Sequence, residues 1–205
     1  MRVLPSGDTA LLVETGDLAT AHRLNAAIRE AALPGIIDVV PGESTVLVVT
    51  DPASCDLGRL AAHLPSLRLP DHDAVAPELL EVRVRYDGED IAEVAELTGL
   101  TPGEVVERHA TPTYTVAYLG FSPGFGYLSG LDPALHVSRR ASPRTAVPAG
   151  SVAIAGPYAA IYPSRSPGGW RLLGRTEIPL WDVRRDPPSL LQPGTRIRFV
   201  PEEAR

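Results

Sequence analysis

The chain of 205 residues contains no lysine, so its 19 lysine-plus-arginine positions are all arginine. A Walker A phosphate loop needs its lysine, so the chain carries no ATP site of that kind. A pyridoxal Schiff base and a catalytic serine–lysine pair are excluded for the same reason. Guanidinium groups remain for anion binding, and they hold carboxylates and phosphates well.

Cysteine and long apolar runs are also scarce. The single Cys55 excludes an intrachain disulfide and a cysteine-rich metal site. No run approaches the roughly 18 consecutive apolar residues of a membrane-spanning helix. The first residues lack the basic segment and apolar core of a signal peptide. We therefore expect a cytoplasmic protein with no membrane partner.

Charge is distributed unevenly along the chain. Residues 1–100 hold 7 arginines and 17 acidic residues, for a net charge of −10, whereas residues 139–185 hold 8 arginines and 2 acidic residues, for +6. A net-negative protein with one basic segment is a poor candidate for binding nucleic acid. The basic segment favours a small anionic ligand, although an arginine-rich solvated surface would give the same pattern.

The first third of the chain alternates strand and helix patterns. Asp17 is the expected N-cap of a helix that ends at Pro34-Gly35. This third predicts a small β-β-α-β-β-α domain over residues 1–78. Residues 65–79, with the acidic cluster Asp71-His72-Asp73, are the expected linker. The expected elements are strands at 3–4 and 9–15, a helix over 18–33, a hairpin of 36–40 with 45–50, and a helix over 54–64.

The second part is expected to form a domain over residues 79–205. An alternating strand at 80–86 and a helix over 89–98 come first. Thr101 and Glu104 then form the sequence pattern of a capping box, which predicts a helix over 102–110. The short β runs that follow, separated by glycine and proline, predict a closed, irregular β-barrel and an α+β class for the whole chain. The runs are 113–119, 151–155, 158–162, 170–173, 178–181 and 195–199.

One motif is similar to the nucleophile elbow of a hydrolase. The run from Gly120 to Gly124 has the pattern G-x-S-x-G and follows a predicted strand. The oxyanion hole of that elbow uses the backbone N–H of the residue after the serine, and Pro123 has none. No helical pattern follows either, so we reject this interpretation. A dinucleotide loop at residues 124–130 is rejected because no helix follows it.

The segment Ser164–Trp170 combines the features of a small binding site. Its paired glycines let the backbone approach a ligand, its hydroxyls and arginine can bind oxyanions, and Trp170 can form a wall. A tight turn between two barrel strands would explain the same residues. Arg144 and Arg175 flank these strands, where they either hold an anion or form surface ion pairs.

Six blocks of the sequence, taken in order, match a known family. The sequence resembles the family of 5-oxoprolinase B-type subunits, which is also labelled allophanate hydrolase subunit 1 and includes the kinase inhibitor Kip. Related sequence occurs in the carboxyltransferase region of urea carboxylase. The blocks are Arg108–Tyr114, Leu119–Phe125 with Tyr127–Leu128, Pro143–Arg144, Val147–Val152 with Ile154–Gly156, Ile161–Pro163, and Ser166–Trp170 with Gly174–Thr176.

The resemblance implies a small α/β domain followed by a cyclophilin-like β-barrel. It implies that the chain acts with a C-type subunit, which is a carboxyltransferase homologue with a related barrel, and with an A-type subunit. Such complexes open the lactam ring of 5-oxo-L-proline to L-glutamate with ATP hydrolysis, and we expect ATP and Mg²⁺ to bind the assembled complex. Two alternatives stay open: an inhibitor of a sensor histidine kinase, and a component of urea or allophanate hydrolysis.

The resemblance also marks the expected site residues. Arg144 and Arg175 are expected to hold substrate or phosphate oxygens. His109 either assists proton transfer, orients the adjacent loop, or interacts with the dipole of its helix. No residues have the spacing of metal ligands, so no metal site is expected. The expected substrate-binding residues are Tyr114, Phe121, Tyr127, Ser164, Ser166, Gly168, Gly169 and Trp170.

The sequence departs from the family pattern at three places. Arg171 stands where glutamine is frequent, and Ala159-Ala160 replaces a usual threonine–glycine pair. Gly126 stands where proline or alanine is common. These differences can adjust the pocket, and they leave the identity of the substrate open.

Overall fold

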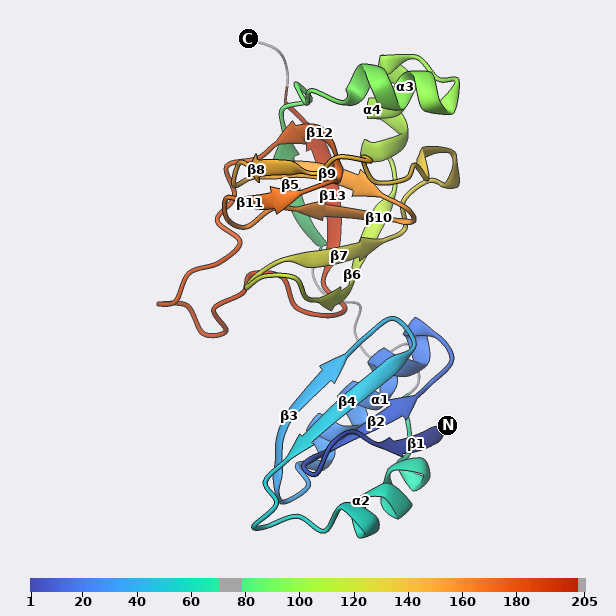
Figure 1. The fold of residues 1–205 in the computed structure, drawn as a ribbon, viewed down its shortest axis with the longest axis vertical. Helices are drawn as coiled ribbons and strands as arrows, with labels where there is room; N and C mark the ends of the chain where they lie inside the picture. The colour runs from blue at the N-terminus through green and yellow to red at the C-terminus, as the bar shows by residue number, and fades with distance from the viewer. Residues whose placement is uncertain (71–78, 203–205) are drawn as a thin grey trace. The chain divides into compact units, whose positions relative to one another are not determined.

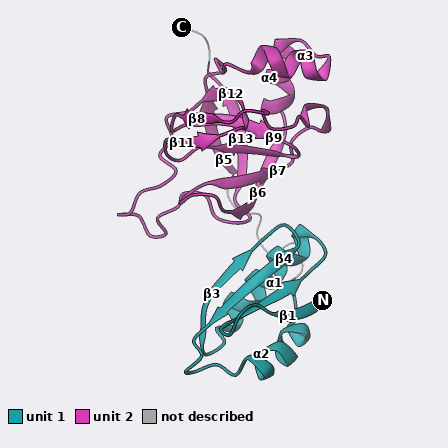
Figure 2. Cartoon of the chain, viewed as in Figure 1, with its two compact units in different colours: residues 1–76 teal, residues 77–205 magenta. Residues whose placement is uncertain are grey.

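The computed structural model of the protein describes residues 1–70 and 79–202. The chain forms two compact units, Met1–Ala76 and Pro77–Arg205, which we call the N-terminal unit and the barrel unit (Figure 2). The predicted α+β class, with a small α/β part before a β-barrel, is confirmed. The acidic cluster Asp71-His72-Asp73 and the predicted domain boundary at residue 78 lie outside the described residues.

The N-terminal unit is a four-stranded antiparallel sheet with two helices (Figure 1). The strand order is β1-β2-β4-β3. Helix α1 packs Leu24 and Ile28 into one core with Val13, Val46 and Val48 of the sheet. The elements are β1 (Arg2–Pro5), β2 (Ala10–Glu14), α1 (Leu18–Ala31), β3 (Ile36–Pro41), β4 (Thr45–Thr50), α2 (Leu57–His63) and the 3₁₀ turn η1 (Leu64–Ser66).

Both helices of this unit are shorter than predicted. The side chain of Asp17 caps α1 by accepting the N–H of Thr20 at 2.7 Å. Helix α1 ends at Ala31 because Ala32 adopts a left-handed backbone with φ of 44°. Helix α2 begins after Asp56, whose carboxylate accepts the N–H of Arg59 at 3.0 Å. Side-chain caps therefore set where both helices begin, and a left-handed residue sets where α1 ends. Apolar periodicity alone places such boundaries only within a few residues.

The barrel unit is built on a seven-stranded sheet in the order β12-β9-β10-β7-β6-β13-β5. Arg85, directly after β5, and Arg175, at the end of β12, exchange two backbone hydrogen bonds of 2.9 Å that close the sheet. Strand β5 pairs in parallel with β13. The elements are β5 (Leu79–Val84), α3 (Ile91–Thr98), α4 (Pro102–Ala110), β6 (Thr113–Leu119), β7 (Gly126–Ser129), η2 (Pro133–Leu135), β8 (Arg144–Val147), β9 (Ser151–Ala155), β10 (Tyr158–Ile161), β11 (Ser166–Gly168), β12 (Arg171–Arg175) and β13 (Arg196–Pro201).

Helices α3 and α4 pack against the barrel. The predicted capping box is present, because Thr101 N–H donates to Glu104 at 2.8 Å and Glu104 N–H donates to the Thr101 hydroxyl at 3.3 Å. Val94 of α3 and Val105 of α4 are buried in the barrel's own core beside Phe199. Within the described ranges, no helix combines the length and the apolar character needed to cross a membrane.

One predicted strand does not form, and three observed strands were not predicted. Residues 178–181 lie in the long loop between β12 and β13 (Figure 1). In this loop Trp181 forms an isolated bridge with Ser189. Pro179 in this segment has no N–H to donate to a strand partner. Strands β7, β8 and β11 have three or four residues each, too few to carry a readable alternation.

Candidate functional site

A small cavity of about 70 Å³ lies in the barrel unit. Most of its lining is aromatic, and one side chain is charged. Such a lining suits a small ligand with a flat or apolar body and one anionic group. The lining residues are Phe121, Phe125, Tyr127, Arg139, Tyr162, Gly168, Gly169 and Trp170.

The glycine-rich motif at residues 120–124 forms a tight loop at this cavity. Ser122 N–H donates to the carbonyl of Gly120 at 2.8 Å, and Phe125 N–H donates to the carbonyl of Ser122 at 3.0 Å. Phe121 has a φ of 67°, a left-handed conformation that non-glycine residues rarely adopt. Strand β7 follows the loop where a nucleophile elbow would lead into a helix. The rejection of the hydrolase elbow therefore agrees with the geometry.

The walls of the cavity are a rigid cluster of aromatic rings. The ring of Phe125 contacts those of Tyr162 and Trp170 edge-on, with centroids 5.3 Å and 5.6 Å apart. Tyr127 contacts Phe125 and Trp170 in the same way, at 5.3 Å and 5.6 Å. Each such contact contributes about 0.5–1.5 kcal/mol beyond the buried area. The cavity is therefore preformed, because these contacts hold the rings in place.

Gly168 leaves the space that Tyr162 occupies. A β-carbon at residue 168 would collide with the phenolic oxygen of Tyr162, whereas one at Gly169 would meet nothing closer than 3.5 Å. Burial raises the pKa of Tyr162, and this outweighs the opposing effects of a backbone hydrogen bond and two nearby arginines. The phenol is therefore protonated at neutral pH and can donate a hydrogen bond.

Arg139 supplies the charge of the cavity. Its guanidinium carbon lies 5.8 Å from the centroid of the Trp170 ring, within the range of a cation–π contact. None of the ion pairs in the described part of the chain involves Arg139. An arginine without a carboxylate partner, beside an aromatic wall, can bind an incoming carboxylate or phosphate.

Arg144 and Arg175, the two arginines predicted for this role, are held by carboxylates and do not line the cavity. Arg144 donates to Asp90 at 2.7 Å and to Glu89 at 3.2 Å. Arg175 pairs with Asp87 at 2.8 Å. Their partners lie far from them in the sequence, so the net charge of segment 139–185 overstates the positive charge available to a ligand.

Asp90 is the centre of this ion-pair network. Its side chain is only 3% exposed and accepts from Arg140 at 2.9 Å, from Arg144 at 2.7 Å and from the N–H of Leu172 at 2.7 Å. Burial by itself raises the pKa of Asp90, but the hydrogen bonds from Arg144 and Leu172 and the charges of both arginines outweigh it and lower that pKa. Asp90 thereby ties the start of α3 to β12.

Arg171, at the position where the family pattern has glutamine, belongs to the same network. Its side chain pairs with Glu93 at 2.5 Å, and its Nε donates to the carbonyl of Ser138 at 3.3 Å. It does not line the cavity. Of the eight arginines in segment 139–185, those without an ion pair in the described residues are Arg139, Arg165 and Arg185.

His109 and Tyr114 lie in the core of the barrel unit. His109 is fully buried, stacks on Phe199 at 4.6 Å, and has its Nδ1 2.8 Å from the Tyr86 hydroxyl. Burial lowers the pKa of His109 to about 3, so the imidazole is neutral at physiological pH. The Tyr114 hydroxyl donates to the carbonyl of His109 at 2.9 Å. Neither residue lines the cavity, and these contacts favour a structural role.

The structure gathers five of the eight predicted substrate-binding residues at the cavity. Ser164 is exposed, and Ser166 lies on β11; neither is part of the lining. Phe125 and Tyr162 also line the cavity but were not predicted to do so. Both lie inside the matched sequence blocks, and that position could have identified them as lining residues. Arg139 carries no such signal, because the sequence does not distinguish it from Arg140 beside it.

The cavity does not fit a nucleotide. Its volume of about 70 Å³ is far below the roughly 300–1,000 Å³ of clefts that hold drug-sized ligands. The chain also has no lysine to contact a triphosphate. In the parts of the chain that the structure describes, no three histidine, cysteine, aspartate or glutamate side chains are grouped to hold a metal ion. The residues of this cavity therefore do not form a site for ATP.

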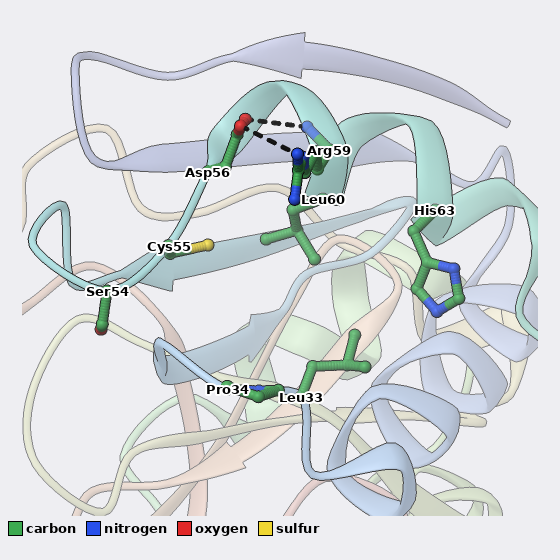
Figure 3. Close-up of a pocket in the computed structure, with 8 residues that line it drawn as sticks. All are labelled: Leu33, Pro34, Ser54, Cys55, Asp56, Arg59, Leu60 and His63. Atoms are coloured by element: carbon green, nitrogen blue, oxygen red, sulfur yellow. Dashed lines mark hydrogen bonds and ion pairs between the residues drawn. The ribbon is translucent and has the colours of Figure 1, made fainter.

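A larger cavity of about 430 Å³ lies in the N-terminal unit, between the end of α1 and helix α2 (Figure 3). Its lining includes Cys55, Asp56, Arg59 and His63. The charged groups bind each other, because Asp56 both caps α2 and pairs with Arg59 at 3.6 Å. None of these residues belongs to a matched sequence block. The barrel cavity, although smaller, is the better candidate because its cation is not neutralised.

Comparison with known proteins places the chain among carboxyltransferase-related sequences. The family model of the carboxyltransferase domain, subdomain C and D, matches residues 1–191. The chain is 40% identical to the B-type subunit of 5-oxoprolinase from Escherichia coli O157:H7, over 96% of this chain and 94% of that protein. It is 41% identical to the corresponding 5-oxoprolinase subunit from Haemophilus influenzae, over 82% and 80%. A urea amidolyase of Lachancea kluyveri is 26% identical over 96% of this chain, which spans 13% of that protein.

Solved structures agree with these relatives. The crystal structure of TTHA0988 superposes with a TM-score of 0.85 and 38% sequence identity over 96% of this chain. This chain spans only 40% of that longer chain. The expected resemblance is confirmed: the chain belongs to the family of the carboxyltransferase domain, subdomain C and D, together with the B-type subunits of 5-oxoprolinase.

Proposed function

We propose that this chain is the B-type subunit of an ATP-dependent 5-oxoprolinase complex, which converts 5-oxo-L-proline to L-glutamate. Relatives with this name at 40% and 41% identity support the proposal, and they align over most of their own length. In this complex the chain acts with an A-type subunit and with a C-type subunit that is a second carboxyltransferase homologue. ATP binds elsewhere in the assembly, and we assign no step of its chemistry to the cavity described above.

The cavity of the barrel unit holds the substrate in this proposal. The observation that carries it is the guanidinium of Arg139, an exposed side chain in the lining of the aromatic cavity that forms no ion pair in the described residues and lies 5.8 Å from the centroid of the Trp170 ring. 5-Oxo-L-proline offers one carboxylate to the arginine and a flat lactam ring to the aromatic walls. The protonated phenol of Tyr162 donates a hydrogen bond to an oxygen of the ligand.

The residues of this chain therefore bind and orient the lactam and exclude bulk water. Hydrolysis adds one water across the lactam C–N bond and produces the second carboxylate and the amino group of glutamate. Holding the lactam still removes much of the entropic cost of that step. Arg144, Arg175 and His109 contribute by fixing the barrel around the cavity, since the two arginines pair with carboxylates and the Nδ1 of His109 meets the Tyr86 hydroxyl.

The test is reconstitution of the complex with matched arginine variants. The chain is co-expressed with its candidate A-type and C-type partners, and ATP-dependent release of glutamate from 5-oxo-L-proline is measured with each component omitted in turn. Arg139→Gln should raise KM at least about tenfold, because a charge-assisted hydrogen bond contributes about 1.5–3 kcal/mol. Arg165→Gln is the control, since Arg165 is exposed and lies outside the lining. An unchanged KM in Arg139→Gln contradicts the assignment of the cavity.

A related amide substrate is the second candidate. The similarity to the urea amidolyase of Lachancea kluyveri, over 96% of this chain, favours a protein that acts on urea or allophanate. The same assembled complex is tested with urea and with allophanate in place of 5-oxo-L-proline. Turnover of urea or allophanate, without release of glutamate from 5-oxo-L-proline, would replace the first proposal with the second.

A further inference from the structure

The cation of the barrel cavity stands on irregular backbone. Arg139 lies between η2 and β8, in a stretch, residues 136–140, that is neither helix nor strand. Its side chain is exposed, and a free arginine side chain has many rotamers to lose when it binds an anion. The place of its guanidinium, 5.8 Å from the centroid of the Trp170 ring, therefore depends on the contacts that hold this stretch of backbone.

The backbone on either side of this arginine is bound to the residues on either side of Trp170. The N–H of Arg140 donates to the carbonyl of Gly169 at 2.7 Å. The carbonyl of Ser138 accepts from the Nε of Arg171 at 3.3 Å. These two hydrogen bonds keep residues 138–140 alongside the indole.

One carboxylate oxygen on α3 meets both of these flanking arginines. The Oε2 of Glu93 lies 2.5 Å from Nη1 of Arg171 and accepts from Nη1 of Arg140 at 3.2 Å. Arg140 has a second carboxylate in Asp90, at 2.9 Å. The side chain of Arg171 is only 10% exposed, and Glu93 is the acid with which it pairs in the described residues. A guanidinium buried to this extent rearranges when its carboxylate is removed. Glu93 itself is half-exposed and does not line the cavity.

The ion-pair network around Glu93 is neutral as a whole. It joins three acids to three arginines, which are Glu89, Asp90, Glu93, Arg140, Arg144 and Arg171. Removing the charge of Glu93 makes the surroundings of the cavity more positive, which by itself strengthens the binding of an anion. Loss of a positioning contact weakens that binding. The sign of the change therefore separates the two roles.

We propose that Glu93 is a positioning residue of the lactam site. Through Arg171 and Arg140 it fixes residues 138–140, so that the guanidinium of Arg139 stays at the Trp170 ring and meets the carboxylate of the ligand. This inference rests on the proposed function, because the ligand is taken to be a carboxylate that binds Arg139. A cation that is held in place before the ligand arrives loses less rotamer freedom on binding.

The kinetic test uses the reconstituted complex and two substitutions of the same residue. Glu93→Ala removes the oxygen that both arginines share and should raise the KM for 5-oxo-L-proline about three- to tenfold, with kcat little changed. Glu93→Gln keeps an uncharged oxygen at that place and should raise KM less. A purely electrostatic role would lower KM equally in both variants, which would overturn the proposal.

The matched control is Glu89→Ala. Glu89 also pairs with an arginine of the network, Arg144 at 3.2 Å, but its side chain is 77% exposed and it has no ion pair with Arg140 or Arg171. Glu89→Ala should therefore keep the KM of the wild type. An increase in KM equal to that of Glu93→Ala would overturn the assignment to Glu93.

A second control asks whether Glu93 acts through the cavity arginine. In an Arg139→Gln background the guanidinium is already absent, so Glu93→Ala should raise KM no further. A general structural role of Glu93 would raise KM by the same factor in both backgrounds. That result would overturn the proposal.

A measurement without ligand separates this inference from the proposed function. In NMR spectra of the uncomplexed chain, the Nε–H signal of Arg139 is identified by its loss in Arg139→Gln, and the Trp170 ring should shift it upfield. Glu93→Ala should lose most of this shift, whereas Glu89→Ala should keep it. An unchanged signal in Glu93→Ala overturns the positioning role even if the complex releases glutamate. If the signal moves but the wild-type complex releases no glutamate, the proposed substrate fails and the positioning of Arg139 by Glu93 stands.

Discussion

The two units of the molecule bury different kinds of side chain. In the N-terminal unit, the polar residue buried among those described is Thr50. The barrel unit buries charged and polar groups in its interior. These are Asp90, His109, Ser151, Arg171 and Ser189.

This difference explains why the candidate site lies in the barrel unit although the larger cavity lies in the other. The polar side chains around the N-terminal cavity act locally, as when Asp56 caps the helix that follows it. In the barrel unit, Asp90 binds Arg144 and Leu172, which lie 54 and 82 residues away. Buried polar partners hold the strands and loops in fixed positions, and a rigid scaffold is what a binding site requires.

Of the substitutions that test this comparison, removal of the buried carboxylate of Asp90 should change the unfolding free energy most. Asp90→Asn leaves Arg140 and Arg144 beside a neutral amide, and breaking a buried ion pair costs about 3 kcal/mol or more of unfolding free energy. Both tryptophans, Trp170 and Trp181, lie in the barrel unit. Their fluorescence during urea unfolding therefore reports the stability of that unit.

The matched control is Asp56→Asn in the N-terminal unit. Asparagine caps helices about as well as aspartate, so its unfolding free energy, followed by circular dichroism, should change by less than about 0.5 kcal/mol. Equal losses of unfolding free energy in the two variants would show that polar side chains stabilise both units to the same extent.

The lowered pKa of Asp90 makes the unfolding free energy of the barrel unit depend on pH. Its contribution is complete above the ordinary aspartate pKa and is lost as the pH falls through the lower folded value.

A smaller effect is expected from crowding the cavity. Gly168→Ala drives a methyl group into the Tyr162 phenolic oxygen, and Tyr162 is too buried to move away freely. Overpacking of this kind costs about 1–3 kcal/mol and should also weaken lactam binding. The β-carbon of Gly169→Ala would lie no closer than 3.5 Å to any other atom, so this variant should keep both its stability and its lactam binding. Urea unfolding and calorimetry on both variants test this, and equal behaviour would contradict the packing argument.

The smallest effect at neutral pH is expected from the buried histidine. With a folded pKa of about 3 for His109, the unfolded chain binds a proton that the folded chain does not between pH 6.5 and 3. Stability should therefore fall as the pH is lowered through this range, on the order of 1 kcal/mol per pH unit. His109→Phe should remove that dependence and cost about 1 kcal/mol at pH 7, because the Tyr86 hydroxyl loses its partner.

The control for this experiment is His63→Gln on the surface of the N-terminal unit. His63 is exposed, so this variant shows what removing a histidine from the surface does to the pH profile of unfolding. Unfolding free energies from pH 4 to pH 7 distinguish the two variants. A wild-type profile in His109→Phe would mean that another group causes the acid sensitivity.

The parts of the fold that were predicted well depend on neighbours in the sequence. The helix after Asp17, the capping box at Thr101 and the strands at 113–119 and 151–155 follow from caps and from apolar or β-branched runs. The strand predicted at 178–181 failed because β-propensity does not reveal whether a partner strand exists. Five residues predicted to bind substrate line the cavity, because glycine and aromatic residues stand out within the matched blocks; their binding of substrate stays a prediction.

The residues alone are enough to infer the class of the fold, the family, the absence of a lysine-dependent site and the loops around the cavity. Which arginine is available to a ligand depends on how the chain folds. Arg144 and Arg175 meet carboxylates brought from residues 87–90, whereas Arg139 meets the face of an aromatic ring. The reason is physical: net charge is a sum over the chain, but the binding of an anion depends on which charges remain unpaired after folding.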